Sequence, residues 1–334
     1  MLKNHLKKNW ENYTGTTLPT TLDIAPITSC TADYGNDVIL IFTGRNRYPE
    51  YVMKICRSSK YGFKLENEFA ALKSRSSIKS LSTYIPTPYY IGEVGQQVFF
   101  LQGAFPGTNL FRLIKKRGMS PKNERLLNQS VELLAAINTS KTHLDSKNTM
   151  GNPSSADILF RFEREFIHSG ISKKKINELQ DYLQQSRRNP IRFFLHGDYW
   201  PANILVDERE NRINGIIDWE FAAAQSTSPM DIIWFLVNLG YCLHLHKDSS
   251  MDIPTAFVQT FFSRGVYAET LADLFDRYVA MTKIDRGSFR ILLEITLAVI
   301  SMRELIAYGK HSAMDRLSLK MLLHTVENEK SLCV

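Results

Sequence analysis

The segment from His196 to Asp218 carries polar side chains at a spacing that constrains the whole chain. Asp198 follows the pair His196-Gly197, Asn203 lies five positions after Asp198, and Asp218 comes fifteen positions after Asn203. Asp, Asn and Gly all favour turns, so each can be present for a local reason. At average residue usage, however, His-Gly-Asp followed by Asn at this spacing arises in roughly one chain of this length in a thousand. The segment supplies one candidate proton acceptor and two candidate ligands for a hard cation such as Mg²⁺.

The sequence on both sides of these residues predicts strands and turns. An apolar run at 192–195 predicts a strand that ends just before the first aspartate. Two further apolar runs, 204–206 and 213–217, flank the very polar stretch 207–212, which is typical of a hairpin turn. Both aspartates therefore follow predicted strand ends.

The segment resembles the catalytic loop of a known family, the aminoglycoside phosphotransferase and choline-kinase-like group of small-molecule kinases. Gly197 stands where protein kinases usually carry Arg, and Asp218-Trp219-Glu220 stands where they carry Asp-Phe-Gly. The resemblance runs from about residue 25 to about residue 240. It implies an α+β, two-lobed protein-kinase-like fold. Residues 1–103 would form a small antiparallel β lobe that binds the nucleotide, and residues 104–334 a larger, mainly helical lobe.

The resemblance also implies a reaction and roles for the residues. The γ-phosphate of ATP or GTP would pass to a hydroxyl of a small molecule such as a sugar, an amino alcohol or an aminoglycoside-like compound. Asp198 would be the catalytic base, and Asn203 and Asp218 would hold Mg²⁺. His196 is better explained as a packed, hydrogen-bonded loop residue, because the neighbouring aspartate already supplies an acid–base group.

A lysine and a glutamate upstream fit the same pattern. Lys54 interrupts the apolar strand 51–55, where it would by itself suggest a solvent-facing side chain. The segment 64–72 then follows with apolar residues at helical spacing. Glu68 is the preferred partner to hold the ammonium of Lys54 near phosphate, and Glu66 is the alternative.

Two further segments are predicted to contact the nucleotide. The apolar strand 97–101 runs into a turn, and the resemblance implies that the backbone of Gln102 to Ala104 holds adenine; an ordinary buried strand before a Pro-Gly turn is the alternative. The phosphate-covering loop should lie between residues 27 and 38, but this stretch contains a single glycine. The resemblance implies a short loop with small hydroxyl residues instead, in which Ser29 and Thr31 could offer hydroxyl or N–H groups to phosphate, and the choice between ATP and GTP stays open.

Helical patterns dominate the second half of the chain. Asp231 opens one of them, where it could cap the helix and where the resemblance implies that it braces the catalytic loop. Neither apolar segment, 232–245 or 291–302, is long and uninterrupted enough to span a bilayer. The predicted helices cover residues 124–138, 158–168, 232–245, 271–281 and 289–305.

Composition agrees with a cytoplasmic enzyme without a separate linker. A chain of 334 residues, 44% of them hydrophobic, can bury a large core. The basic N-terminus lacks the apolar core of a secretory signal. The four cysteines form no CxxC pair, so neither zinc nor a disulfide framework is expected.

The formal charge of +7 does not identify a partner. The basic residues are spread thinly, so nucleic-acid binding is not expected. A polycationic acceptor would need carboxylates, and the nearest supply is Asp157, Glu163, Glu165 and Glu220. Arg161 and Arg164 alternate with the first three, so ion pairs on a helix explain them equally well. A neutral or anionic acceptor fits at least as well as an aminoglycoside.

Two hypotheses of different classes remain. The first is an active small-molecule kinase. The second is a pseudokinase-like nucleotide-binding or assembly protein with little transfer activity, which the poor phosphate loop favours. Retention of the full polar set opposes it, because such groups are costly in or near a cleft. A protein substrate is not expected, since only about a dozen residues separate Asp218 from the helix that Asp231 opens.

Overall fold

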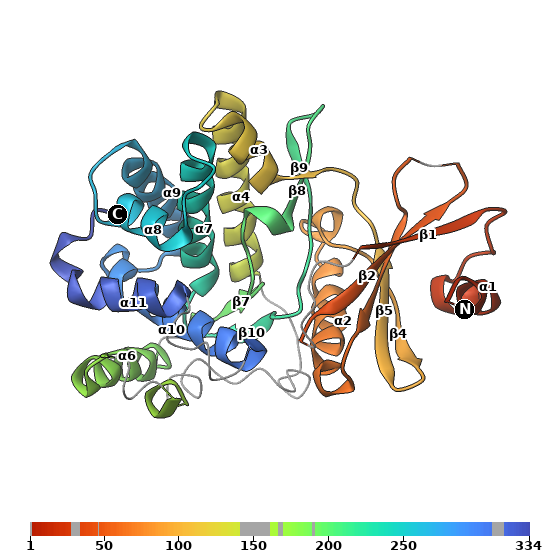
Figure 1. Ribbon diagram of the computed structural model, residues 1–334, viewed down its shortest axis with the longest axis horizontal. Coiled ribbons are helices and arrows are strands. Elements are labelled where there is room, and N and C mark those ends of the chain that lie inside the picture. Colours follow the sequence, from red (N-terminus) through yellow and green to blue (C-terminus); the bar gives the residue numbers. More distant parts are fainter. Residues whose placement is uncertain are drawn as a thin grey trace. The chain divides into compact units, whose positions relative to one another are not determined.

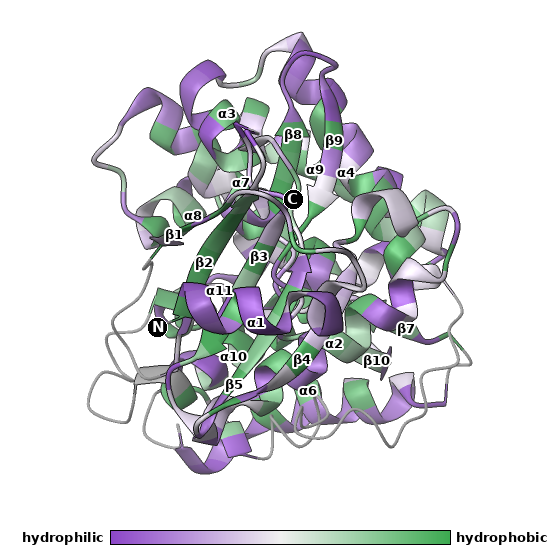
Figure 2. Ribbon diagram, turned by 90° about the vertical axis from the view of Figure 1, so that its right-hand side faces the viewer, coloured by the Kyte–Doolittle hydropathy of each residue, from purple (hydrophilic) through white to green (hydrophobic). Residues whose placement is uncertain are grey.

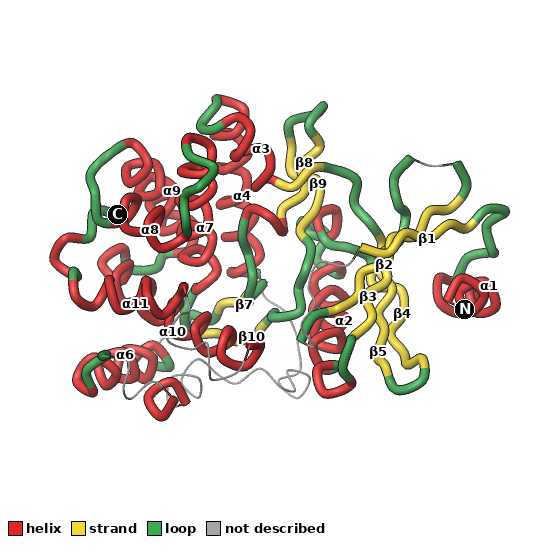
Figure 3. The backbone as a smooth tube through the Cα atoms, in the orientation of Figure 1, coloured by secondary structure: helices red, strands yellow, loops and turns green. Residues whose placement is uncertain are grey.

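The computed structural model describes residues 2–27, 34–45, 47–140, 161–165, 170–188, 191–308 and 317–334. These residues divide into two compact units (Figure 1). The first unit contains the described residues up to 108 together with 205–222. The second contains 109–140, 223–334 and the described residues between 161 and 204. Strands dominate the first unit and helices the second (Figure 3), so the predicted α+β class is confirmed.

The first unit is built on a five-stranded sheet of order β1-β2-β3-β5-β4, in which all neighbouring strands are antiparallel. β-branched and aromatic residues are frequent in these strands, as a pleated, half-buried surface favours. The strands of the sheet are β1 (Leu22–Ile27), β2 (Asn36–Thr43), β3 (Tyr51–Cys56), β4 (Pro88–Val94) and β5 (Gln97–Gly103).

The remaining described strands lie outside this sheet. They are β6 (Thr108–Asn109), β7 (Phe193–Leu195), β8 (Ile204–Asp207), β9 (Arg212–Ile216) and β10 (Ala223–Ser226). The predicted hairpin around residues 207–212 is present as β8 and β9, which are hydrogen-bonded neighbours.

Two helices cover opposite faces of the five-stranded sheet (Figure 1). α2 (Phe63–Ser76) packs on one face, where Phe69 meets Phe100 with ring centroids 5.6 Å apart. α1 (Leu2–Thr14) covers the other face and directs its hydrophilic side outward (Figure 2).

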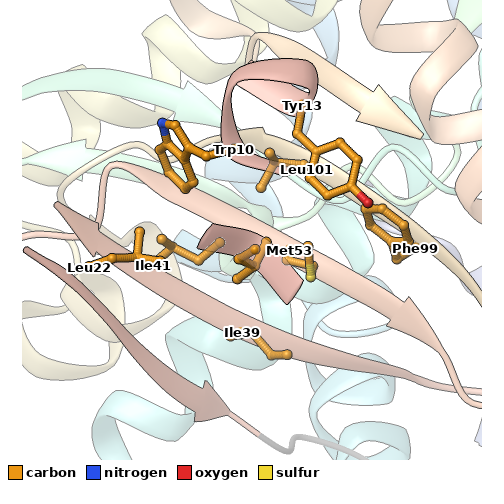
Figure 4. Packing of buried hydrophobic residues seen from close by; sticks show 9 residues of the cluster. Trp10, Tyr13, Leu22, Ile39, Ile41, Met53, Phe99 and Leu101 are labelled. Atoms are coloured by element: carbon orange, nitrogen blue, oxygen red, sulfur yellow. The ribbon is translucent and has the colours of Figure 1, made fainter. Parts of the chain in front are cut away.

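A buried apolar cluster joins α1 to the sheet (Figure 4). Leu6, Trp10 and Tyr13 come from the helix, at spacings of four and three residues that place them on one face. The sheet contributes Leu22, Ile39, Ile41, Met53, Phe99 and Leu101. α1 is an element not predicted above, although the spacing of these apolar residues in the sequence indicates a helix.

The second unit is mainly helical, and its helices surround α7, most of whose residues are buried. The predicted helices at 124–138, 232–245, 271–281 and 289–305 are confirmed; the one at 158–168 lies partly outside the described residues. No described helix is both long and apolar enough to cross a membrane. The helices are α3 (Leu110–Arg117), α4 (Pro121–Thr139), α6 (Lys173–Ser186), α7 (Met230–Lys247), α8 (Ile253–Phe261), α9 (Val266–Thr282), α10 (Phe289–Tyr308) and α11 (Leu317–Glu327).

Truncation of Trp10 should destabilise the first unit. Its side chain is 2% exposed and fills the space between α1 and the sheet. We expect Trp10→Ala to lower the free energy of unfolding by about 3–5 kcal/mol, because it leaves a cavity in the cluster. Urea unfolding followed by circular dichroism measures this loss. Lys8→Ala, at an exposed position of the same helix, should change it by less than about 0.5 kcal/mol, and equal losses in both variants would contradict the packing role.

Candidate functional site

In the first unit, the side chain of Lys54 joins two carboxylates. Its Nζ lies 2.8 Å from both carboxylate oxygens of Glu68 and 2.7 Å from Oδ1 of Asp218. β3 supplies the lysine and α2 supplies Glu68, whose side chain is completely buried. The alternative partner, Glu66, is exposed on the same helix. The structure thus brings Lys54 together with Glu68 and Asp218.

The charges of this group are set by burial and by proximity. Burial lowers the pKa of Lys54, but the carboxylates of Asp218 and Glu68 outweigh burial and raise this pKa above its ordinary value. Lys54 is therefore an ammonium at neutral pH. Burial also raises the pKa of Glu68, and the nearby ammonium opposes that rise. The close contacts to both of its oxygens are those of an ion pair.

Asp218 is positioned differently from Glu68. Its side chain is 38% exposed, so a ligand can reach it. Its backbone has a φ of 70°, in the left-handed region that few residues other than glycine adopt. Residues held in this region cluster at functional sites.

Side chains that were not predicted as site residues hold the segment after Asp218 by hydrogen bonds and an ion pair. Oε1 of Glu220 forms an ion pair with Nζ of Lys64 at 2.9 Å. Oε2 of Glu220 accepts a hydrogen bond from Nδ2 of Asn36 at 2.9 Å. Asn67 donates to the backbone carbonyls of Glu220 and Ala222. Burial raises the pKa of Glu220, and Asp218 raises it further. Glu220, considered above as a partner for a polycation, is thus already bonded to Lys64.

In the second unit, Asp231 holds the loop that follows β7. Its Oδ2 accepts the N–H of His196 at 2.7 Å and its Oδ1 accepts the N–H of Gly197 at 2.9 Å. Gly197 has a φ of 85°, which explains why glycine occupies this position. Asp231 therefore braces the loop backbone. The expectation that it caps its helix is wrong, because α7 has no side-chain cap and the carboxylate is directed to the loop.

A buried polar network extends from Asp231 to two other helices. Asn138 of α4 donates to Oδ2 of Asp231 at 3.2 Å and to the Phe194 carbonyl at 2.7 Å. Tyr278 of α9 donates its O–H to Oδ1 of Asn138 at 2.6 Å. Burial raises the pKa of Asp231, and the N–H groups of the loop and of Asn138 oppose that rise. The network satisfies a carboxylate that would be costly to bury alone.

Asp198 lies in this loop, and its carboxylate accepts a hydrogen bond on each oxygen. Asn203 Nδ2 donates to Oδ2 at 3.0 Å and to the Asp198 carbonyl at 2.9 Å. The indole N–H of Trp234 donates to Oδ1 at 2.9 Å. His196 is fully buried and accepts the N–H of Asp198 on Nδ1, as a packed loop residue would.

The segment predicted to hold adenine is engaged within the first unit. The side chain of Gln102 is buried, the N–H of Gly103 donates to the Thr87 carbonyl at 2.8 Å, and the N–H of Ala104 donates to the Glu50 carbonyl at 2.9 Å. The role of Gln102 and Ala104 stays a prediction, and it would have to use carbonyl groups or displace these bonds. Ser29 and Thr31 lie outside the described residues.

The polar groups present suit Mg²⁺, which typically takes one or two protein oxygens and completes its shell with water and phosphate. Asp218 offers an accessible carboxylate, and the hydrogen bonds of Asn203 are made by Nδ2, which leaves Oδ1 as the oxygen suited to a metal. Among the described residues, no group of three or more His, Cys, Asp or Glu side chains could hold a metal by itself. The carboxylate of Asp218 in the first unit and the amide oxygen of Asn203 in the second unit are therefore each, taken separately, a ligand type that suits Mg²⁺ bound to phosphates.

Comparison with known proteins identifies the family. The family model of the phosphotransferase enzyme family matches residues 26–228. The chain belongs to this family. The predicted family and enzyme class, a phosphotransferase with an alcohol group as acceptor, are therefore confirmed. A sequence search of curated proteins finds no match.

Solved structures show the same fold as this phosphotransferase at low identity. The complex of APH(2'')-IIIa with GDP and kanamycin has 14% identity, a TM-score of 0.55 and 98% coverage of both chains. The ternary complex of APH(2'')-IIa with streptomycin and ATP has 13% identity and a TM-score of 0.55, covering 95% of this chain and 97% of the other. Ethanolamine kinase from Plasmodium vivax has 12% identity and a TM-score of 0.53, covering 91% and 81%. The predicted kinase-like fold is confirmed.

The Lys54–Glu68 pair yields a test by paired substitution. Lys54→Met leaves a buried carboxylate without its closest cation, so we expect the free energy of unfolding to fall by about 3–5 kcal/mol. Lys54→Met combined with Glu68→Leu should recover most of that loss, because replacing both members of a buried pair by apolar groups is often nearly neutral. Urea unfolding of the single and double variants decides the matter. A double variant as unstable as the single one would contradict the assignment of the cost to an unpaired charge.

The backbone of Gly197 offers a second test. Gly197→Ala should cost about 1 kcal/mol or more, because alanine is strained at its positive φ. Gly44→Ala is a matched control, since Gly44 has a φ of 67° and its new methyl group would meet no atom within 4 Å. Hydrogen exchange should accelerate at the amides of His196 and Gly197 only in the first variant. Acceleration at those amides in both variants, or in neither, would contradict the role of Gly197.

Proposed function

We propose that this phosphotransferase transfers the γ-phosphate of ATP or GTP to a hydroxyl group of a small molecule, with Asp198 as the catalytic base. The observation that carries the proposal is the hydrogen bonding of the Asp198 carboxylate. Each of its oxygens accepts a hydrogen bond, and the residue remains partly exposed. Donors on both oxygens favour the ionised form, which is the form that accepts a proton. The family assignment supplies the reaction class.

The other groups have roles in positioning phosphate. Lys54, held by Glu68, would orient the phosphates of the nucleotide through its ammonium. Asp218 and Asn203 would hold Mg²⁺, which supplies positive charge to neutralise the phosphate oxygens. Solved structures similar to this chain contain GDP or ATP, and both GTP and ATP are kept as donors here.

The transfer step needs little covalent chemistry from the protein. Asp198 would accept or orient the proton of the acceptor hydroxyl. The hydroxyl oxygen bonds to the γ-phosphorus, and the bond between the γ-phosphorus and the leaving nucleoside diphosphate breaks. Charge spreads over the phosphoryl oxygens in this step, so correct placement and nearby cations lower the barrier. A fixed carboxylate and a fixed ammonium provide these two contributions.

The acceptor is best described as a neutral or anionic hydroxyl compound, such as a sugar. Three of the described carboxylates considered for a polycation already lie near cations: Glu220 contacts Lys64, Glu165 contacts Arg164, and Glu163 lies 4.0 Å from the ammonium of Lys173. Two others, Asp248 and Asp252, hydrogen-bond to Ser250 and Thr255. Asp157 lies outside the described residues. An aminoglycoside would have to compete with these cations.

The second candidate is a nucleotide-binding assembly protein with little transfer activity. The observations that favour it are the single glycine between residues 27 and 38 and the engaged N–H groups of Gly103 and Ala104. Both candidates predict a protein of the cytoplasm. The described cysteines Cys56, Cys242 and Cys333 are free thiols, as that compartment favours.

Turnover assays with matched variants test the proposal. Nucleoside diphosphate release is measured with MgATP and MgGTP on a panel of sugars, amino alcohols, nucleosides and aminoglycosides. We expect acceptor-dependent release that falls by about 10²–10⁴-fold in Asp198→Ala, the contribution typical of a base, and that is also lost in Asp218→Ala. Asp181→Ala, at an exposed position of α6, should retain wild-type turnover.

Two outcomes would overturn parts of the proposal. Nucleotide binding by the wild type, seen as a rise in melting temperature, without release on any acceptor would favour the assembly protein. Full activity in Asp198→Ala would remove Asp198 from the role of base while leaving the family assignment intact. Preferred turnover of a polycationic aminoglycoside would contradict the proposed acceptor class.

A further inference from the structure

One face of α7 reaches both the backbone and the side chain of the loop that contains Asp198. Asp231 and Trp234 are three residues apart, so they lie on the same face of the helix within one turn. Asp231 accepts the N–H groups of His196 and Gly197, and Trp234 donates to Oδ1 of Asp198. A single helix therefore sets the path of the loop and contacts the carboxylate that the loop presents.

Trp234 is unusual among its neighbours in the helix. Ile233 and Phe235 on either side of it are fully buried, whereas Trp234 remains partly exposed. Its indole N–H lies 2.9 Å from Oδ1 of Asp198. A tryptophan that served only to fill the core would not need this contact, because Phe or Leu could pack there without a polar atom at that point.

Two donors from different elements fix the orientation of the Asp198 carboxylate. Trp234 holds Oδ1 from α7, and Asn203 holds Oδ2 from the turn before β8. Rotation of the carboxylate about its last bond would break both hydrogen bonds. With only one donor the plane of the carboxylate would be set less firmly.

The backbone just before Asp198 is fixed as well. The N–H of Gly197 donates to Asp231, and the Gly197 carbonyl accepts a hydrogen bond from the guanidinium of Arg303 in α10. These three residues and Trp234 also line a narrow cavity of about 10 Å³ beneath the loop, close to the space that one water molecule needs. The backbone is therefore held independently of Trp234, which leaves the side chain of Asp198 as the group that the indole orients.

The chemistry of the indole suits this role. Its N–H can donate a hydrogen bond and cannot accept one, whereas a hydroxyl can do both. The indole can therefore bond to the carboxylate only as a donor to one of its oxygens, whereas a hydroxyl could also turn its own lone pairs to another donor.

We propose that Trp234 is a positioning residue for phosphoryl transfer, whose indole N–H orients the carboxylate of Asp198. The inference rests on the proposed function, in which Asp198 is the base. Trp234 acts through Asp198, so its loss affects the chemical step more than the binding of nucleotide. Trp234 would thus be a side chain of this protein that contributes to the reaction class of its family.

Trp234→Phe tests the proposal, because it keeps an aromatic ring and removes the donor. We expect kcat to fall about tenfold to a hundredfold, as for the loss of a hydrogen bond to a charged group. KM for the nucleotide should change less than about twofold, because binding does not use this contact. Trp10→Phe, which removes an indole N–H that bonds Thr16 in the first unit, should leave kcat and KM at the wild-type values.

An unchanged kcat in folded Trp234→Phe would overturn the proposal. So would equal losses in Trp234→Phe and Trp10→Phe, since these would indicate a general effect on stability. Wild-type protein without turnover on any acceptor would instead remove the proposed function on which the inference rests.

A second measurement does not require the Trp234 variant to fold. Among the four tryptophan indole N–H resonances of the wild type, one should shift in the NMR spectrum of Asp198→Ala, because the carboxylate that accepts its hydrogen bond is removed. If no indole resonance shifts in Asp198→Ala, the contact between Trp234 and the carboxylate does not act as proposed.

Discussion

The acceptance of two backbone N–H groups by the buried Asp231 carboxylate is the interaction on which the second unit's candidate site depends. A buried carboxylate must have its hydrogen bonds satisfied, so the surroundings of Asp231 have little freedom. Its partners require a glycine with positive φ at position 197 and an amide at position 138. The direction of the loop, and with it the placement of Asp198, follows from satisfying one charge.

The first unit meets a similar requirement with a cation. The ammonium of Lys54 is almost completely buried, and the carboxylates of Glu68 and Asp218 compensate for its loss of water. Such a pair contributes little net stability compared with apolar packing, but it allows few arrangements of the side chains. In each unit, therefore, a buried charge stabilises the fold less than apolar packing at the same place would. In return it fixes the position of a polar group, the Lys54 ammonium in one unit and the Asp198 loop in the other.

The parts predicted from the sequence are those whose spacing carries the information. The strand around Lys54, the helix with Glu68 and the hairpin before Asp218 follow from local patterns of apolar and polar residues. The network around Asp231 could not be predicted in this way. Asn138 and Asp231 are 93 positions apart, and Tyr278 lies 140 positions from Asn138. Contacts at such separations depend on helix packing, which no local pattern specifies.

The position of Trp234 shows how a local rule and a distant contact combine. Its spacing from Asp231 is visible in the sequence, and helical geometry then places both on one face. What the sequence does not show is that this face meets the loop of Asp198, 36 positions earlier. Asp231 fixes the loop backbone at His196 and Gly197. The residue at position 234, one turn further along α7, then lies near the side chain of Asp198. A donor at that position can orient the carboxylate, and an apolar residue there can only pack against it.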